Sequence, residues 1–538
     1  MQNMGKLGVM IDCSRNAVMS VSGLKRFIDT INKMGYNRLL LYMEDVYEVE
    51  NEPLFGYMRG RYTKKELKEI DTYAFEKGVE VVPCIQTLAH LNQIFTYGTY
   101  SQINDVNDIL LVGEERTYQL IDNMFKTCNE CFMTKTLHIG MDEAHLLGLG
   151  KYLDKHGYKD RNQLFLEHLN KVCDLAKKYQ FKPMIWSDMF FHLAFNTYYV
   201  KDGEIPQWVR EKVPKNVELV YWDYYADDRE TYEKMIEKHL AFDNKVSFAG
   251  GAWKWLSFSP MNGYSIPRNQ LALEACNKYG VQDRMITLWC DDGNECPWYA
   301  VLPSLMHFAE CSRGNYDLEI IKQKFSDLFG ENFDDFIMLD LKFPDNFNKK
   351  TPESNGAKAM FYNDPFLGKF DSVVYGNGEE VEQYKKFCTK IKKAKCRSVN
   401  YKYIFEFYER FTEFLSVKYD LGYRTRKAYQ EGDKKGLVKI VLDYKKAEKL
   451  LKKFNKAFKD LWFADNKASG FDVQELRIGG LLMRIESCSE RLLRYLNGEI
   501  ETIEELEEKL VDYYGGETLE KTLPVCWRRA QSTTVNIL

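Results

Sequence analysis

Up to about residue 300, the chain alternates between short runs of β-branched and aliphatic residues and longer segments with apolar residues at helical spacing. The helical pattern is clear in Ser22–Met34, and it recurs in Arg161–Tyr179 and Arg229–Phe242. Eight short runs have the composition of strands: Leu7–Asp12, Arg38–Met43, Val79–Gln86, Thr136–Met141, Lys182–Ser187, Val217–Tyr221, Lys245–Ala249 and Arg284–Trp289.

This alternation predicts an α/β fold in which parallel strands are joined by right-handed crossover helices. Eight strand–helix units are the number that closes a TIM (β/α)8 barrel, and the segments after each strand then line one face. A doubly wound open sheet is the alternative. It would favour a glycine-rich turn after the first strand, where the chain has Cys13-Ser14-Arg15-Asn16 instead.

The pattern changes after residue 312, where Lys, Glu, Leu and Phe dominate. We therefore expect two domains, a barrel at 1–312 and a mostly α-helical accessory domain at 313–538. The lysine-rich segment Lys445–Lys456 is typical of a solvated helix face. Five long helical patterns are visible: Val381–Ala394, Tyr401–Tyr419, Asp433–Phe463, Asp472–Leu496 and Ile503–Asp512.

Composition restricts the class of partner. The 75 Lys and Arg residues nearly balance the 79 Asp and Glu residues among 538, giving a net charge of −4, so there is no electrostatic case for nucleic acid or an anionic membrane. No stretch approaches the roughly 20 apolar residues of a membrane helix. The 13 scattered cysteines and an N-terminal segment without signal-peptide features predict a cytoplasmic protein with reduced thiols. Oligomeric state is left open.

No metal or cofactor is expected. Cys128 and Cys131 form one CxxC without a second pair at zinc-ribbon spacing, and the eight histidines include no His-x-His or HExxH pair.

Residues that could carry chemistry gather at the ends of the predicted strands, where carboxylates follow five strands and tryptophans stand at or just after the ends of four. The most specific candidate for catalysis is the pair Asp142-Glu143, which follows the fourth strand. Two neighbouring carboxylates raise each other's affinity for protons, which suits a general acid. Acidic residues that cap the following helix would have the same position, so spacing alone leaves both interpretations open.

The string His138-Ile139-Gly140-Met141-Asp142-Glu143 resembles the signature of the β-N-acetylhexosaminidases, glycoside hydrolase family 20. The family often has His-x-Gly-Gly-Asp-Glu, so Met141 replaces a glycine. The resemblance extends over about residues 5–312 and implies a barrel that hydrolyses oligosaccharides or glycoconjugates ending in N-acetylhexosamine. Strand-like residues begin by Leu7, so we do not expect the α+β domain that commonly precedes the barrel in this family. The helical C-terminal region resembles that of a bacterial clade.

The resemblance also implies roles for single residues. Glu143 matches the general acid/base, and Asp142 matches the carboxylate that orients the acetamido group of the substrate. Arg15 matches the arginine that binds ring hydroxyls of the terminal sugar. His90 matches a histidine that the family holds behind the acid, and Asp45 matches the aspartate that supports this histidine, which together give a relay Asp45–His90–Glu143.

Aromatic residues at the other strand ends match the walls of the sugar pocket, namely Trp186, Trp222 and Trp289. Asp291 occupies the place of a glutamate that binds outer hydroxyls. The family usually has a tyrosine after the seventh strand, but Trp253-Lys254-Trp255 stand there. We expect Trp253 to contact the substrate and Tyr224 to supply the missing hydroxyl.

In this family the 2-acetamido oxygen of the substrate replaces a protein nucleophile. The resemblance thus implies substrate-assisted, retaining and exo-acting hydrolysis. Two alternatives remain open at this point. One is a retaining glycosidase with Glu143 as acid/base and Asp188 or Asp291 as nucleophile, and the other is a catalytically silent carbohydrate-binding barrel.

Overall fold

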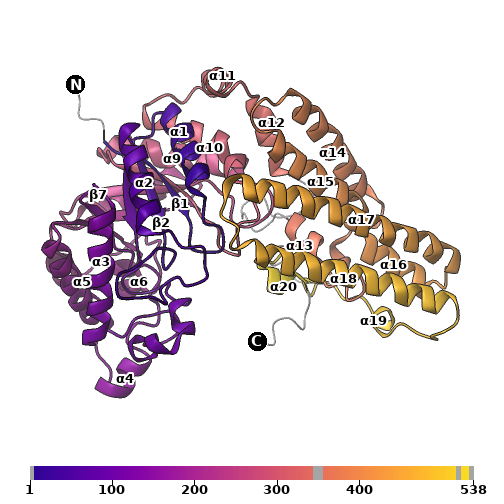
Figure 1. The fold of residues 1–538 in the computed structure, drawn as a ribbon, viewed down its shortest axis with the longest axis horizontal. Coiled ribbons are helices and arrows are strands. Elements are labelled where there is room, and N and C mark those ends of the chain that lie inside the picture. Colours follow the sequence, from indigo (N-terminus) through magenta and orange to yellow (C-terminus); the bar gives the residue numbers. More distant parts are fainter. Residues whose placement is uncertain (1–4, 343–355, 517–522, 532–538) are drawn as a thin grey trace.

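The computed structural model describes residues 5–342, 356–516 and 523–531. A closed barrel of eight parallel strands forms one half of the molecule, and a bundle of helices forms the other (Figure 1). The strands are β1 Leu7–Asp12, β2 Arg38–Tyr42, β3 Glu80–Cys84, β4 Thr136–His138, β5 Lys182–Trp186, β6 Glu218–Trp222, β7 Val246–Gly251 and β8 Arg284–Leu288. All eight predicted strands are confirmed.

Each strand pairs with the next in parallel, and β8 pairs with β1 to close the barrel, with Val9 opposite both Leu39 and Ile286. Alternate residues point inward and outward. Met10 lies in the inner cluster with Leu40, whereas Val9 and Ile11 pack outward against the helices. Both faces of each strand are thus buried, which explains the nearly continuous apolar runs in the sequence.

The helices that surround the barrel are α1 Val21–Lys33, α2 Lys64–Glu76, α3 Glu115–Cys131, α4 Lys151–His156, α5 Arg161–Lys178, α6 Asp188–Phe195, α7 Gln207–Lys212, α8 Arg229–Leu240, α9 Asn262–Tyr279 and α10 Leu302–Ser312. The side chain of Ser20 accepts a hydrogen bond from the Gly23 N–H and thereby caps α1. The three helices predicted in this part of the chain are confirmed, with ends that differ by at most two residues.

The remaining helices are α11 Leu318–Phe329, α12 Phe333–Ile337, α13 Ala357–Tyr362, α14 Glu379–Arg397, α15 Lys402–Lys418, α16 Leu421–Gln430, α17 Lys434–Asp465, α18 Phe471–Leu496, α19 Glu504–Glu507 and α20 Trp527–Gln531. The prediction of a helix over Ile503–Asp512 is wrong beyond Glu507, where α19 ends. Ile503 and Leu506 are buried, but Val511 is 72% exposed and does not extend the apolar face.

The two halves share one hydrophobic core. Phe258, from the loop after β7, packs against Phe361 of α13, Phe411 of α15 and Phe454 of α17. A bridge between Met19 and Asn466 also joins the loop before α1 to the end of α17. The predicted boundary at residue 312 coincides with the end of α10 and stays a prediction.

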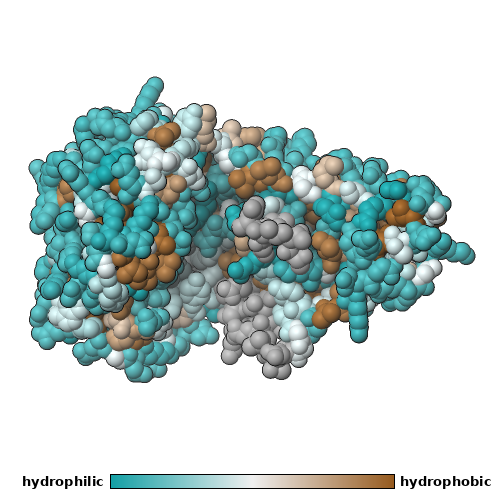
Figure 2. Space-filling view, turned by 90° about the horizontal axis from the view of Figure 1, so that it is seen from below, coloured by the Kyte–Doolittle hydropathy of each residue, from teal (hydrophilic) through white to brown (hydrophobic). Residues whose placement is uncertain are grey.

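The face seen in Figure 2 is mainly hydrophilic, with hydrophobic residues in scattered patches. Among the described residues, none of the helices combines the length and the apolar composition that a bilayer crossing requires.

Candidate active site

A pocket of about 190 Å³ lies beyond the carboxyl ends of the strands. This is smaller than the roughly 300–1,000 Å³ of sites for drug-sized ligands, so it suits a single small polar ring. Its walls combine charged and aromatic side chains: Arg15, Tyr42, His90, Asp142, Glu143, Trp186, Trp222, Tyr224, Tyr225, Trp255, Trp289 and Asp291. Eight of the ten side chains that the resemblance places at the substrate or behind the acid therefore meet in one pocket, together with the hypothesised Tyr224 hydroxyl group.

The fourth strand ends earlier than predicted, at His138 rather than Met141. Three nearby residues adopt the left-handed backbone region, with φ of 70° at Gly140, 71° at Met141 and 51° at Glu143. Such conformations cost about 1–3 kcal/mol for a residue with a side chain. They turn the chain so that consecutive Asp142 and Glu143 both line the pocket, which consecutive residues of a regular strand do not do.

Asp142 is held at both carboxylate oxygens. Its Oδ1 accepts a hydrogen bond from Gln86 Nε2 at 2.8 Å, and its Oδ2 lies 3.2 Å from Nε2 of His90. Burial opposes ionisation of Asp142, but His90 and Gln86 outweigh it and hold the pKa of this carboxyl below its ordinary value. Asp142 is therefore a buried negative charge, fixed in the wall of the pocket.

Burial alone would lower the pKa of His90, but Asp142, Glu44 and Glu143 raise it to about 10. The His90 Nε2 also lies 3.5 Å from Oε2 of Glu143. His90 is thus an imidazolium at neutral pH that stabilises both carboxylates.

The prediction that Asp45 supports His90 is wrong. Asp108, from the loop after β3, accepts the backbone N–H of His90 at 2.9 Å and lies 4.0 Å from its Nδ1. Asp45 instead faces Arg59 at 3.5 Å, and burial raises the pKa of Asp45 to about 6. No ion pair joins Asp45 to His90 among the described residues. The long loop from His90 to Asp108 folds back and supplies the carboxylate, which strand order does not reveal.

Glu143 lies at the rim, with its side chain 49% exposed. Its backbone N–H donates to Oδ2 of Asp188 at 2.9 Å, and Trp222 Nε1 donates to the other oxygen at 3.4 Å. Burial and the charge of Asp142 raise the pKa of Asp188. Asp188, the first residue of α6, therefore fixes the left-handed backbone of Glu143 from inside the protein.

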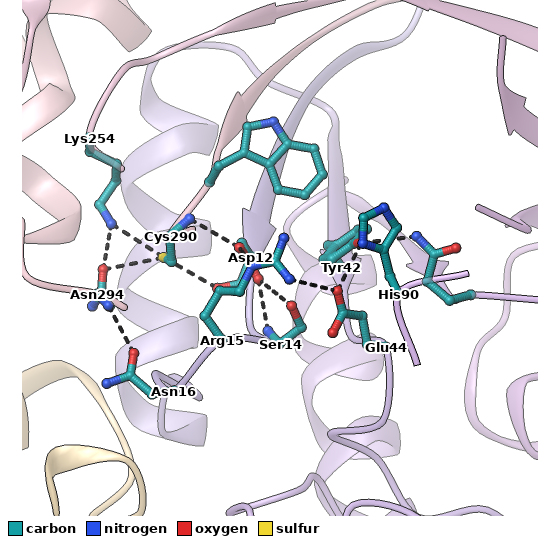
Figure 3. A network of polar contacts seen from close by, with 12 residues as sticks. Asp12, Ser14, Arg15, Asn16, Tyr42, Glu44, His90, Lys254, Cys290 and Asn294 are labelled. Atoms are coloured by element: carbon teal, nitrogen blue, oxygen red, sulfur yellow. Dashed lines mark hydrogen bonds and ion pairs between the residues drawn. The ribbon is translucent and has the colours of Figure 1, made fainter. Parts of the chain in front are cut away.

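The pocket wall opposite Asp142 and Glu143 contains Arg15 and Asp291. Arg15 Nη1 lies 3.1 Å from Glu44 Oε1, and its Nε lies 3.6 Å from Asp12 Oδ2. Asp12 in turn accepts the N–H groups of Ser14 and Cys290, which ties the ends of β1 and β8 together (Figure 3). Burial raises the pKa of Asp291 to about 6, and Arg15 opposes that rise.

A chain of hydrogen bonds joins this wall to Asp142. The carboxylate of Glu44 pairs with Arg15 and accepts the Tyr42 hydroxyl at 3.0 Å, and Gln86 Nε2 donates to the Tyr42 oxygen at 2.9 Å (Figure 3). Gln86 then reaches Asp142. Tyr42, Glu44 and Gln86 were not predicted. Their only signal is their position at the ends of β2 and β3.

Aromatic rings form the rest of the pocket. Trp222 and Tyr224 stack with centroids 5.3 Å apart, and Trp289 Nε1 donates to the Tyr224 hydroxyl at 2.9 Å. Trp186 belongs to the inner barrel cluster and closes the bottom of the pocket. The Tyr224 hydroxyl therefore lies beside Trp289 in the wall of the pocket, and its role toward a substrate stays a prediction.

Trp253 is not in the pocket, contrary to the prediction. It is 2% exposed, stacks on Trp255 with centroids 4.1 Å apart, and donates from Nε1 to the backbone oxygen of Tyr224 at 3.2 Å. Trp255, two residues later, lines the pocket instead. Between them, buried Lys254 contacts Cys290 and Asn294 and thus supports the segment after β8 (Figure 3).

Among the residues that the structure describes, no group of three or more His, Cys, Asp or Glu side chains could hold a metal ion.

Two family models match the chain. The glycosyl hydrolase family 20 catalytic domain matches residues 7–239, and the glycoside hydrolase 20C C-terminal domain matches residues 334–524. Among curated proteins, the chain is similar to hexosaminidase D of Homo sapiens, with 27% identity over 40% of this chain and 44% of that protein. It is 25% identical to a beta-hexosaminidase of Akkermansia muciniphila over 26% of this chain and 34% of that protein. The chain thus spans about half or less of these two relatives.

Solved structures with a similar fold include a β-N-acetylhexosaminidase from Bacteroides fragilis, with 20% identity, a TM-score of 0.44, and coverage of 57% of this chain and 65% of that one. A family 20 exo-β-N-acetylglucosaminidase from Vibrio harveyi in complex with N-acetylglucosamine has 15% identity and a TM-score of 0.46, covering 63% of this chain and 59% of that one.

Proposed function

Because the chain belongs to glycoside hydrolase family 20, we propose that it is an exo-acting β-N-acetylhexosaminidase. It removes terminal β-linked N-acetylglucosamine or N-acetylgalactosamine from oligosaccharides or glycoconjugates. One observation carries the proposal. Asp142 is a buried carboxylate held by Gln86 and His90, and it lies next to half-exposed Glu143 in a pocket walled by aromatic rings.

In this mechanism the acetamido oxygen of the sugar attacks its own anomeric carbon, because the two groups are already joined and correctly placed. Asp142 accepts a hydrogen bond from the acetamido N–H and offsets the positive charge of the oxazolinium ring. A fixed negative charge on a buried side chain stabilises that positive charge more than water does, because it needs no reorganisation during the reaction. Tyr224, whose hydroxyl lies beside Trp289, donates to the acetamido oxygen.

Glu143 is the general acid and then the general base. It protonates the departing oxygen, and it later deprotonates the water that opens the oxazolinium ring with retention. Its place at the rim gives it access to both the leaving group and water. His90 and the N–H bond to Asp188 position it.

Arg15 and Asp291 contact the ring hydroxyls of the terminal sugar, and Trp186, Trp222 and Trp289 pack around the acetamido group and ring. A pocket of about 190 Å³ has room for one sugar, which favours exo action.

The rival mechanism with a protein nucleophile has less support. Asp188 already accepts hydrogen bonds from Glu143 and Trp222, and burial and Asp142 raise its pKa, so it is a poor nucleophile at neutral pH. Asp291 lies beside Arg15, at the ends of β1 and β8, while Glu143 follows β4 on the other side of the barrel.

The test compares aryl β-glucosides with the matching N-acetylglucosaminides. We expect hydrolysis only of the acetamido sugars, and strong inhibition by a thiazoline that mimics the oxazoline. Asp142→Asn should lose about 10²–10³ in kcat and most of its affinity for the thiazoline. Rapid hydrolysis of glucosides, with a trapped glycosyl-enzyme ester, would establish the rival. Sugar binding without any hydrolysis would establish a silent binding barrel.

We also propose a cytoplasmic location for this enzyme. None of the described cysteines forms a disulfide, and most of them are buried. Free, buried thiols are typical of proteins in a reducing compartment.

A further inference from the structure

A second cavity, of about 270 Å³, adjoins the loop that carries Glu143. We call it the side cavity. It lies between the loop after β4, the first residue of α5 and the helix α6. Its lining consists of His145, Arg161, Met189, His192, Leu193 and Asn196. None of these residues is acidic, and none of them lines the sugar pocket.

Arg161 gives the side cavity its positive charge. Its Nε donates to the backbone oxygen of Leu147 at 3.3 Å, and one Nη donates to the backbone oxygen of His145. No carboxylate among the described residues forms an ion pair with it, and burial lowers its pKa. A half-buried guanidinium without a counter-charge is stabilised by an oxyanion, and its planar fork matches a carboxylate in particular.

Three further polar side chains face the same space. The rings of His145 and His192 meet edge to face with centroids 4.4 Å apart. Within the described part of the chain, neither ring and neither end of the Asn196 amide forms a hydrogen bond. Burial and His145 lower the pKa of His192, so this ring is a neutral donor at pH 7. His145 and Asn196 are exposed to solvent and His192 is partly buried, so the side cavity offers one positive charge and several hydrogen-bond donors without a protein partner.

The side cavity lies directly behind the proposed acid. The His145 N–H donates to the backbone oxygen of Glu143 at 2.6 Å. Asp188, which accepts the Glu143 N–H, and His192 are four residues apart on α6, so they share one face and are separated by about one turn of 5.4 Å.

The topology of the barrel indicates the direction in which the leaving group departs. Arg15 and Asp291 follow β1 and β8, whereas Glu143 and Asp188 follow β4 and β5, on the far side of an eight-strand barrel. If Arg15 and Asp291 hold the outer hydroxyls of the terminal sugar, the leaving group departs over Glu143, toward the side cavity. This step rests on the proposed function.

We propose that the side cavity binds a carboxylate on the leaving-group sugar, so that the preferred substrate is an N-acetylhexosamine β-linked to a uronic acid. Arg161 pairs with the carboxylate, and Asn196 and the two imidazoles donate to it. Met189 and Leu193 form the apolar side of the site.

The test uses two disaccharides, N-acetylglucosamine β-1,4-linked to glucuronate and to glucose, which differ only in the carboxylate. Asn196→Asp is nearly isosteric and suits the left-handed backbone of Asn196, but it places a negative charge in the side cavity. We expect it to lower the ratio of kcat/KM for glucuronate over glucose at least tenfold. Arg161→Gln should do the same. Lys171→Gln, on the exposed side of α5, removes an equal charge and should leave the ratio unchanged.

The proposal is overturned if Asn196→Asp and Arg161→Gln leave the ratio unchanged, whether both disaccharides keep their rates or lose them equally. If the wild type hydrolyses neither disaccharide, the proposed function has failed, and calorimetry with glucuronate and glucose then tests the side cavity by itself. Binding of glucuronate that Asn196→Asp abolishes would support the site, and absence of binding would refute it.

Discussion

Gly140 offers a sharp test of how Asp142 is positioned. An added Cβ at Gly140 would overlap the side-chain oxygen of Gln86 and lie 2.7 Å from the carbonyl oxygen of Ile85. The backbone at Ile85 has little freedom because it pairs with His138. In Gly140→Ala, Gln86 must therefore move, and its hydrogen bonds to Met141, Tyr42 and Asp142 are lost or weakened.

The expected loss of folding stability follows from these contacts. The hydrogen bond to charged Asp142 contributes about 1.5–3 kcal/mol and each neutral one about 1 kcal/mol, and a left-handed alanine costs about 1–2 kcal/mol. If all three hydrogen bonds are lost, we expect Gly140→Ala to destabilise the protein by roughly 4.5–7 kcal/mol. With Asp142 held by His90 but no longer by Gln86, its orientation is less fixed, and kcat on an aryl N-acetylglucosaminide should fall about 10–10²-fold.

Gly280 is the matched control, because its φ of 71° equals that of Gly140 within one degree and no atom lies within 4 Å of an added Cβ. Gly280→Ala should show only the backbone cost of about 1–2 kcal/mol and unchanged kcat. The assay is thermal unfolding together with steady-state hydrolysis for both variants. If the two variants match in melting temperature and in kcat, the Gln86 contact does not position Asp142.

Three further predictions concern the same pocket. Glu143→Gln should abolish hydrolysis of substrates with poor leaving groups but not binding of N-acetylglucosamine, and near-normal rates on such substrates would rule out its role as the acid. Arg15→Ala should lower kcat/KM for every N-acetylhexosaminide, whatever the leaving group; an effect confined to one leaving group would assign Arg15 to another subsite. The pKa of His90 in the folded protein, about 10, exceeds its ordinary 6.5, so its stabilising effect is complete below pH 6.5 and is lost as the pH rises to 10. The difference in melting temperature between the wild type and His90→Gln should therefore shrink between pH 7 and pH 10, and a constant difference would contradict the charged state of His90.

The periodic part of the sequence determined the barrel. A strand buried on both faces requires a continuous apolar run, and its helix requires an apolar stripe, so Leu7–Asp12 and α1 are both readable from local pattern. Parallel strands in a closed barrel also place their carboxyl ends on one face. The meeting of Arg15, Asp142 and Trp289 in one pocket follows from that rule alone.

The local sequence pattern predicts a helix less well where that helix depends on tertiary packing. α16 contains few apolar residues and begins Leu421-Gly422, so it was missed, although Leu421 and Thr425 are buried. Its stability comes from packing of this buried face against neighbouring helices rather than from intrinsic helix propensity.

Only the tertiary structure decided which side chains pair within the site. Asp108 rather than Asp45 faces His90 because an irregular loop returns to β3, and Trp255 rather than Trp253 reaches the pocket because the segment after β7 leaves the strand. His90 and Met141 adopt left-handed backbone conformations that their side chains do not favour. Periodicity describes regular backbone and the burial of its faces. The direction of a side chain in an irregular loop depends on contacts with distant residues, and those exist only once the barrel has closed.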